Sequence, residues 1–238
     1  MLNLLAAFTP TKASPIDLVV LHLIKLVGRA YSLVAHVPQK KLSQNPTQTE
    51  RIFNSFNKFE DAYKGKVTLH SYKGISPYAT MHNDVCYLAL ESSTLIIVPF
   101  HKQWILGWTT ESSFALKQLN KNVLEKAPCS VGVLIDRGDQ KMFWCGFRKG
   151  SIYQVVVLFF DGADDREALS YARRMRHADS KLMSEIRKWK HGELGVIGEI
   201  LASLNIRAKR SILVVQQQIR FWGSRDPEES THLRRVDI

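Results

Sequence analysis

Apolar runs rich in β-branched residues alternate along the first half of this chain with stretches whose apolar positions recur at helical spacing. The runs predict buried strands at residues 17–26, 66–72, 94–100 and 129–135. The helical patterns between them cover residues 50–63, 77–90 and 112–127, and the first eight residues have the pattern of an amphipathic helix end. Strands that alternate with helices predict an α/β fold, in which helices cover both faces of a mainly parallel sheet.

Two local signals add to this pattern. A polar loop containing Pro38 and Pro46 is expected after the first strand, and Thr49 is expected to cap the following helix. Gly65 is expected to end that helix.

The second half has the same kinds of element in a shorter space. Strands are predicted at residues 152–160 and 211–216, and helical patterns cover residues 164–177, 178–192 and 193–204. A five-stranded unit needs more room than the roughly 70 residues present, since each crossover takes at least about 10 to 12 residues. We therefore expect a first unit at residues 1–138, a linker at 139–151, a shortened second unit at 152–222 and a charged tail at 223–238.

Composition narrows the class of protein. The 238 residues are 45% hydrophobic, and three cysteines form no close pair, which argues against a disulfide framework. No stretch approaches the roughly 20 apolar residues that span a bilayer, so the chain by itself is expected to be soluble. The net charge of +11 suggests nucleic acid, an anionic membrane face or an acidic partner. No nucleic-acid-binding signature is present, so nucleic acid is not an expected partner.

The basic residues are mostly scattered. The densest groups are Arg173, Arg174, Arg176 and His177, and then Arg187, Lys188 and Lys190. A solvated face explains such a cluster more often than a binding surface does. Contact with an anionic membrane surface is the alternative that we carry forward.

Five blocks of sequence resemble one family in the same order. They are SPIDLVVLHLIKLVGRAYSLVAH, HNDVCYLALESSTLIIVPFHKQW, LNKNVLEKAPCSVGVLIDRG, VVVLFFDGADDREALSYARRM, and GELGVIGEILAS followed by ILVVQQQ. Together these blocks are similar to the cytosolic C-terminal region of the plant cation/H+ exchanger (CHX) family. The resemblance covers nearly the whole chain.

The resemblance implies a Rossmann-like, three-layer fold made of two units similar to universal stress proteins. It also implies a regulatory role in a monovalent cation (K+)/proton antiporter, in cation and pH homeostasis, at the cytosolic face of an endomembrane or the plasma membrane. The expected partners are the antiporter's membrane domain or another copy of the chain.

The chain departs from the family pattern at several points. These residues contain no counterpart of the family's membrane domain or of the strand expected before the first helix. A truncated or rearranged gene product, or an incomplete gene model, is therefore expected. The middle of the second unit is missing, and Lys25 stands where the family usually has an acidic residue.

A stand-alone nucleotide-binding protein similar to universal stress proteins is the alternative. Such proteins cradle phosphates with Gly-x-x-Gly and a later Gly-Ser or Gly-Thr. Gly192 and Gly195 supply the first part, but no glycine stands at the later offset. Two glycines are a weak signal that helix packing also explains, so ATP is not an expected cofactor.

For each remaining candidate residue, a structural role is weighed against a ligand-binding role. Asp164, Asp165 and Arg166 open a helix, where carboxylates favour capping over a Mg²⁺ site. Asp136 and Arg137 end a strand, where a contact between the units is favoured over a ligand role.

Histidines and cysteines suggest no catalytic or zinc site. His101, just past a strand, is the best placed histidine for sensing pH. No acid, base and nucleophile form a catalytic set, and no Cys/His spacing fits a metal, so neither an enzyme nor a metal site is expected.

Overall fold

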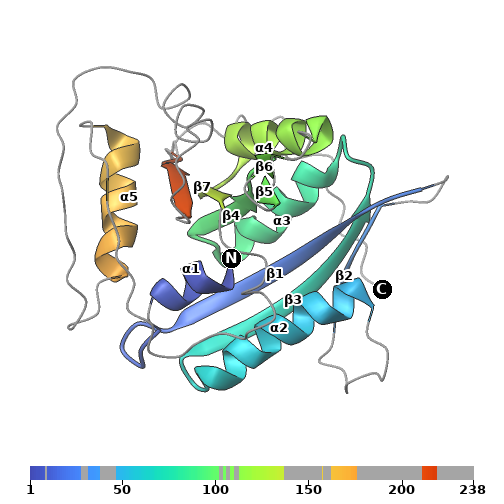
Figure 1. The fold of residues 1–238 in the computed structure, drawn as a ribbon. Helices are drawn as coiled ribbons and strands as arrows, with labels where there is room; N and C mark the ends of the chain where they lie inside the picture. Colours follow the sequence, from blue (N-terminus) through green and yellow to red (C-terminus); the bar gives the residue numbers. More distant parts are fainter. Residues whose placement is uncertain are drawn as a thin grey trace, which may run out of the picture.

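The fold was obtained as a computed structural model (Figure 1). It describes residues 1–8, 10–27, 32–37, 47–101, 104–105, 108–109, 113–136, 157, 162–175 and 211–218. Within these residues the helices are α1 (Leu2–Ala7), α2 (Gln48–Ala62), α3 (Met81–Ser92), α4 (Phe114–Lys126) and α5 (Ala163–Arg174). The strands are β1 (Ile16–Lys25), β2 (Leu33–His36), β3 (Val67–Ser76), β4 (Leu95–Pro99), β5 (Trp104–Ile105), β6 (Trp108–Thr109), β7 (Ser130–Ile135) and β8 (Ile212–Gln216).

The strands β1, β3 and β2 form the first sheet, in that order. β1 runs parallel to β3 over ten residue pairs, from Ile16 beside Val67 to Lys25 beside Ser76. β2 runs antiparallel along the other edge of β3. The sequence pattern predicted a loop where β2 lies. This strand has only four residues, and its side chains are mostly exposed. It therefore lacks the alternation of buried and exposed positions by which a strand is predicted.

The helices α1 and α2 cover one face of this sheet. Phe59 of α2 has no exposed surface and packs with Phe56, Val67 and Leu69, while α1 adds Leu5. The helix α2 begins two residues earlier than predicted, because Thr47 rather than Thr49 is its cap. Glu50 Oε2 accepts the Thr47 amide at 2.7 Å, and Thr47 Oγ1 accepts the Glu50 amide at 3.3 Å, which is a capping box.

The second sheet contains β4, β7 and β8. β4 is parallel to β7, and β8 is antiparallel to β7. The helices α3 and α4 cover this sheet with a core of Met81, Ala89, Ile96, Val98, Leu119, Val123, Ala127, Cys129 and Val131. Cys129 is a buried member of this core. In Figure 1, α4 lies above β4 and α3 lies beside it.

The side chains of β1 link the two helix layers. Leu18 and Val20 point toward the core beneath α2, while Leu23 packs against the core beneath α3 and α4. Because successive strand residues face opposite sides, β1 lies between a layer of α1 and α2 and a layer of α3 and α4. The α/β class is therefore confirmed. The strand pairing is more mixed than expected, since each of the two three-stranded sheets combines one parallel pair with one antiparallel pair. The short strands β5 and β6 form a separate antiparallel pair.

The described parts of the second half pack onto the first half. The phenol of Tyr171 in α5 donates to the Thr94 carbonyl at 3.2 Å, and Ser130 donates to Glu167 at 2.9 Å. Burial, and secondarily the hydrogen bond with Glu167, raises the pKa of Tyr171 well above its usual value. With β8 paired to β7, these contacts join α5 and β8 to the second sheet (Figure 1).

Several predicted elements lie outside the described residues. They are the linker at 139–151, the helical patterns at 178–192 and 193–204, the tail at 223–238 and nearly all of the strand at 152–160. The domain boundaries therefore stay a prediction. No helix within the described ranges is long and apolar enough to cross a membrane.

Candidate functional site

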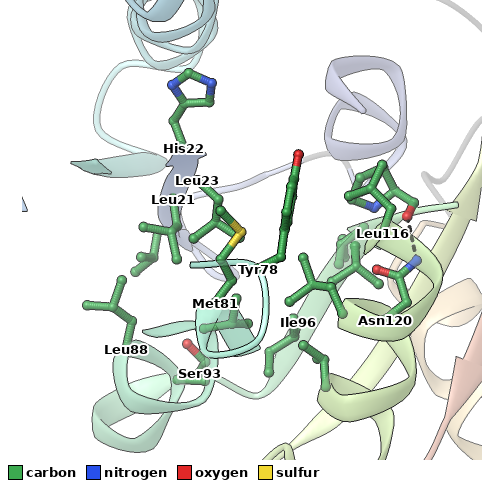
Figure 2. A pocket seen from close by; sticks show the side chains of 18 of the residues that line it. Leu21, His22, Leu23, Tyr78, Met81, Leu88, Ser93, Ile96, Leu116 and Asn120 are labelled. Atoms are coloured by element: carbon green, nitrogen blue, oxygen red, sulfur yellow. Dashed lines mark hydrogen bonds between the residues drawn. The ribbon is translucent and has the colours of Figure 1, made fainter. Parts of the chain in front are cut away.

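A cavity of about 430 Å³ lies between β1 of the first sheet and β4 of the second. β1 contributes Val19, Leu21, His22, Leu23 and Lys25. The helix α3 covers one side, and α4 closes the other with Leu116 and Leu119 (Figure 2). The volume of the cavity falls within the range of small-molecule sites, about 300 to 1,000 Å³.

The lining of the cavity is mainly apolar. Tyr78 stands between the β1 side and the Ile96 side in Figure 2, and Ser93 adds a hydroxyl at the edge. Among the described lining residues, Lys25 alone has a permanent positive charge, and its Nζ lies 5.6 Å from the centre of the Tyr78 ring. A triphosphate needs several cations or backbone amides, whereas the described lining is mainly apolar.

Asn120 is the most buried polar group beside the cavity. Its residue is 5% exposed, and its Nδ2 donates to the Pro99 carbonyl at 2.8 Å. Its Oδ1 has no hydrogen-bond partner among the described residues. Asn120 was not among the predicted site residues, although a polar residue within the apolar stripe of Leu116, Leu119 and Val123 was the available signal.

A second polar group lies between α3 and α4. His82 is 5% exposed, and its Nε2 lies 3.0 Å from the Lys126 ammonium. Burial is the main cause that lowers the pKa of His82, and the charge of Lys126 adds to it. Burial also raises the pKa of the neighbouring Cys86 thiol. His82 is therefore neutral at pH 7, and Cys86 is a protonated thiol rather than an activated nucleophile.

Asp136 connects parts of the fold that are distant in sequence. Its Oδ1 accepts a hydrogen bond from the Ser211 hydroxyl at 2.9 Å, and its Oδ2 lies 3.4 Å from the amino group of Met1. The contact with Ser211 confirms that Asp136 joins the first half to the second. Its predicted neighbour Arg137 lies outside the described residues.

The acidic block at the start of α5 is used structurally. Asp165 is 5% exposed, and its Oδ2 accepts the Gly162 amide at 3.0 Å. Asp164 Oδ1 accepts the Gln217 amide at 2.6 Å, just after β8. The Arg166 amide donates to the Gly162 carbonyl within the first turn. Asp165 thus caps the helix, whereas Asp164 ties the start of α5 to the end of β8. No group of three or more metal-ligating side chains occurs among the residues that the structure describes.

His101 lies directly after Phe100 at the carboxyl end of β4, with the two ring centres 4.1 Å apart. Its carbonyl accepts the Ser113 amide at 3.2 Å. His101 is not one of the residues that line the cavity as described, and its role in sensing pH stays a prediction. Gly192 and Gly195 lie outside the described residues, so the predicted phosphate cradle is untested.

Comparisons with known proteins identify the relatives of the chain. Residues 18–139 match the family model described as the plant cation/H(+) antiporter domain. The chain is 44% identical over 182 residues to cation/H(+) antiporter 15 of Arabidopsis thaliana, covering 74% of this chain and 22% of that protein. It is 39% identical over 178 residues to cation/H(+) antiporter 14 and to cation/H(+) symporter 13 of the same plant. These two alignments cover 74% of this chain, and 22% and 21% of the relatives.

The chain thus spans between a fifth and a quarter of the length of these curated relatives. No solved structure gives a significant match. The matched segment runs from the second residue after the start of β1 to a few residues past the end of β7, and it contains the cavity and the helices that cover it. A family model that covers half of the chain, together with these identities, shows that the chain belongs to the plant cation/H+ antiporter family.

Proposed function

We propose that this chain acts as a cytosolic regulatory domain of a monovalent cation/proton antiporter that contributes to potassium and pH homeostasis. The observation that carries the proposal is the family match over residues 18–139, which coincides with β1 to β7. The relatives are named as cation/H+ antiporters and a symporter.

The described fold supports a role outside the ion pathway. None of its helices, over the ranges given above, could cross a bilayer, and ion translocation needs polar groups placed within a membrane-spanning structure. The fold instead offers a packed core and an apolar cavity, which suit docking and regulation. The docking partner that we propose is the membrane domain of an antiporter or a second copy of the chain.

Exchange of segments tests the proposal. The segment of Arabidopsis cation/H(+) antiporter 15 that aligns with this chain is deleted or replaced by this chain, and K+/H+ exchange is measured in membrane vesicles across a range of pH. Deletion should change the rate or its pH dependence, and replacement should restore it. A replacement carrying Phe59→Ala, which disrupts the core, should fail to restore it. Equal exchange at every pH with and without the segment would contradict a regulatory role.

A further inference from the structure

We propose that one edge of the molecule, formed by Lys12, Lys64, Lys66, Arg173 and Arg174, binds the anionic surface of a phospholipid membrane. We call these five residues the basic edge. They come from three segments: the turn before β1, the link between α2 and β3, and the last turn of α5. The inference deepens the proposed function and gives the regulatory domain a membrane-facing side.

Direct contacts bring the three segments together. Arg174 Nη2 donates to Ser14 Oγ at 3.2 Å, which places the end of α5 against the turn before β1. That turn is closed by paired backbone hydrogen bonds between Thr11 and Ser14 at 3.2 Å. The Ile16 amide donates to the Lys66 carbonyl at 2.9 Å, so the start of β3 lies beside the same turn. Figure 1 shows α5, the turn before β1 and the start of β3 on the same side of the fold.

The charges of the basic edge face solvent. Lys12, Lys64, Arg173 and Arg174 are exposed, and Lys66 is half-buried. Because long basic side chains extend their charged ends into water even when their stems pack, a half-buried lysine still presents its ammonium.

The neighbouring carboxylates are fewer than the cations. Asp17 is engaged by His70 at 3.2 Å, and Glu60 accepts the Leu69 amide at 2.9 Å. Asp61 is exposed near the end of α2. With five cations and three carboxylates, the basic edge has a net positive charge. Two of the three carboxylates, Asp17 and Glu60, also have contact partners outside the basic edge.

The membrane is the partner that the observations favour. The relatives are named for cation and proton transport, which takes place across a membrane. Anionic lipids attract basic segments near the surface, and each well-placed Lys or Arg raises the affinity roughly fivefold. Phosphate and carboxylate headgroups also match the hydrogen-bonding groups of arginine and lysine. The sequence alone shows Arg173 and Arg174 in one cluster, while Lys12, Lys64 and Lys66 join them only through the fold.

Co-sedimentation of the full chain with lipid vesicles tests the inference. The vesicles contain phosphatidylcholine alone or phosphatidylcholine with phosphatidylserine. We expect binding only with phosphatidylserine, and binding should weaken as salt rises, because ions screen charge. The double variant Lys64→Gln/Lys66→Gln should bind roughly 25-fold more weakly, at about fivefold for each cation removed.

A matched variant separates the basic edge from net charge. Lys117→Gln/Lys121→Gln removes the same charge from exposed positions on α4, and it should bind within about twofold of the unchanged chain. Thermal unfolding checks that both double variants are folded. Equal losses for the two variants would overturn the inference, because net charge alone would then explain binding.

Two further outcomes would also overturn it. One is binding that ignores phosphatidylserine. The other is binding of single-stranded RNA that depends on Lys64 and Lys66, together with no binding to vesicles of either composition.

The vesicles contain no antiporter, so the co-sedimentation result is independent of the exchange assay. Vesicle binding with no effect on exchange would contradict the proposed function and leave the membrane contact standing.

Discussion

The hydroxyl of Ser211 donates a 2.9 Å hydrogen bond to Oδ1 of Asp136, which ties the start of β8 to the end of β7. The two residues are 75 positions apart in the sequence. The other end of β8 is tied to α4 by Gln216 Nε2, which donates to the Leu124 carbonyl at 3.1 Å. These contacts make β8 part of the second sheet.

Ser211→Ala should lower the free energy of unfolding by about 0.5 to 1.5 kcal/mol, because one hydrogen bond is lost at a partly exposed site. Urea unfolding of Ser211→Ala, Asp136→Asn and the double variant measures the coupling between the two side chains. The losses of the single variants should not add in the double variant. Full additivity would mean that the hydrogen bond makes no contribution to stability.

Asp165→Ala should destabilise the protein by about 1 to 2 kcal/mol, because the Gly162 amide at the start of α5 loses its acceptor. Since this carboxylate caps a helix, millimolar Mg²⁺ should not change the melting temperature of the unchanged chain. Asp61→Ala, at an exposed carboxylate near the end of α2, is the control and should have little effect. A rise in melting temperature with Mg²⁺ that Asp165→Ala abolishes would show instead that Asp165 binds a cation.

The stability of the chain should fall as the pH drops below about 6.5, and His82 should contribute to this fall. Its pKa in the folded chain is lowered from 6.5, so the unfolded state binds the proton more readily below that pH. The contribution of His82 is therefore complete above pH 6.5 and is lost as the pH falls toward the lowered pKa.

Urea unfolding between pH 7.5 and about pH 5 measures the dependence on His82. His82→Gln should flatten the decline, because glutamine does not titrate. His70→Gln, at a partly exposed histidine beside Asp17, provides a histidine control. An unchanged pH profile in His82→Gln would show that other groups cause the decline.

Phe59→Ala should cost about 3 to 5 kcal/mol of unfolding free energy, because the ring is fully buried between α2 and the first sheet. Phe114→Ala removes the same side chain from a position that is 78% exposed, and it should change stability by less than about 0.5 kcal/mol. Equal losses for the two variants, measured by urea unfolding, would mean that the core beneath α2 is not packed as described.

Whether the role of a candidate residue could be predicted depends on how far its contact partner lies from it in the sequence. Helix capping by Asp165 was predictable, because its carboxylate and the Gly162 amide that donates to it are three residues apart. The partner of Asp136 was only partly predictable: the pattern suggested a contact between the two halves, but it did not identify Ser211. Asn120 and His82 were missed, because their significance depends on burial between elements from different parts of the sequence.

The sequence by itself determined which segments are helices and strands through most of the described chain. Hydrophobic periodicity and capping depend on residues a few positions apart, so β1, β4, β7 and β8 were each predicted within one residue of their observed bounds. The start of β3 was predicted equally well, but the strand continues four residues beyond the predicted end, to Ser76. Five ordered blocks of sequence likewise indicate the antiporter family without reference to the fold.

Only the tertiary structure decided how these elements meet. The antiparallel pairing of β8 with β7, the cavity between β1 and β4, and the basic edge each join segments that are distant along the chain. A strand's own pattern shows which side chains are buried, but its pairing direction depends on which edges the packed helices leave available. The pairing direction of a strand is therefore set by the packing of the whole chain, and local periodicity contains no information about that packing.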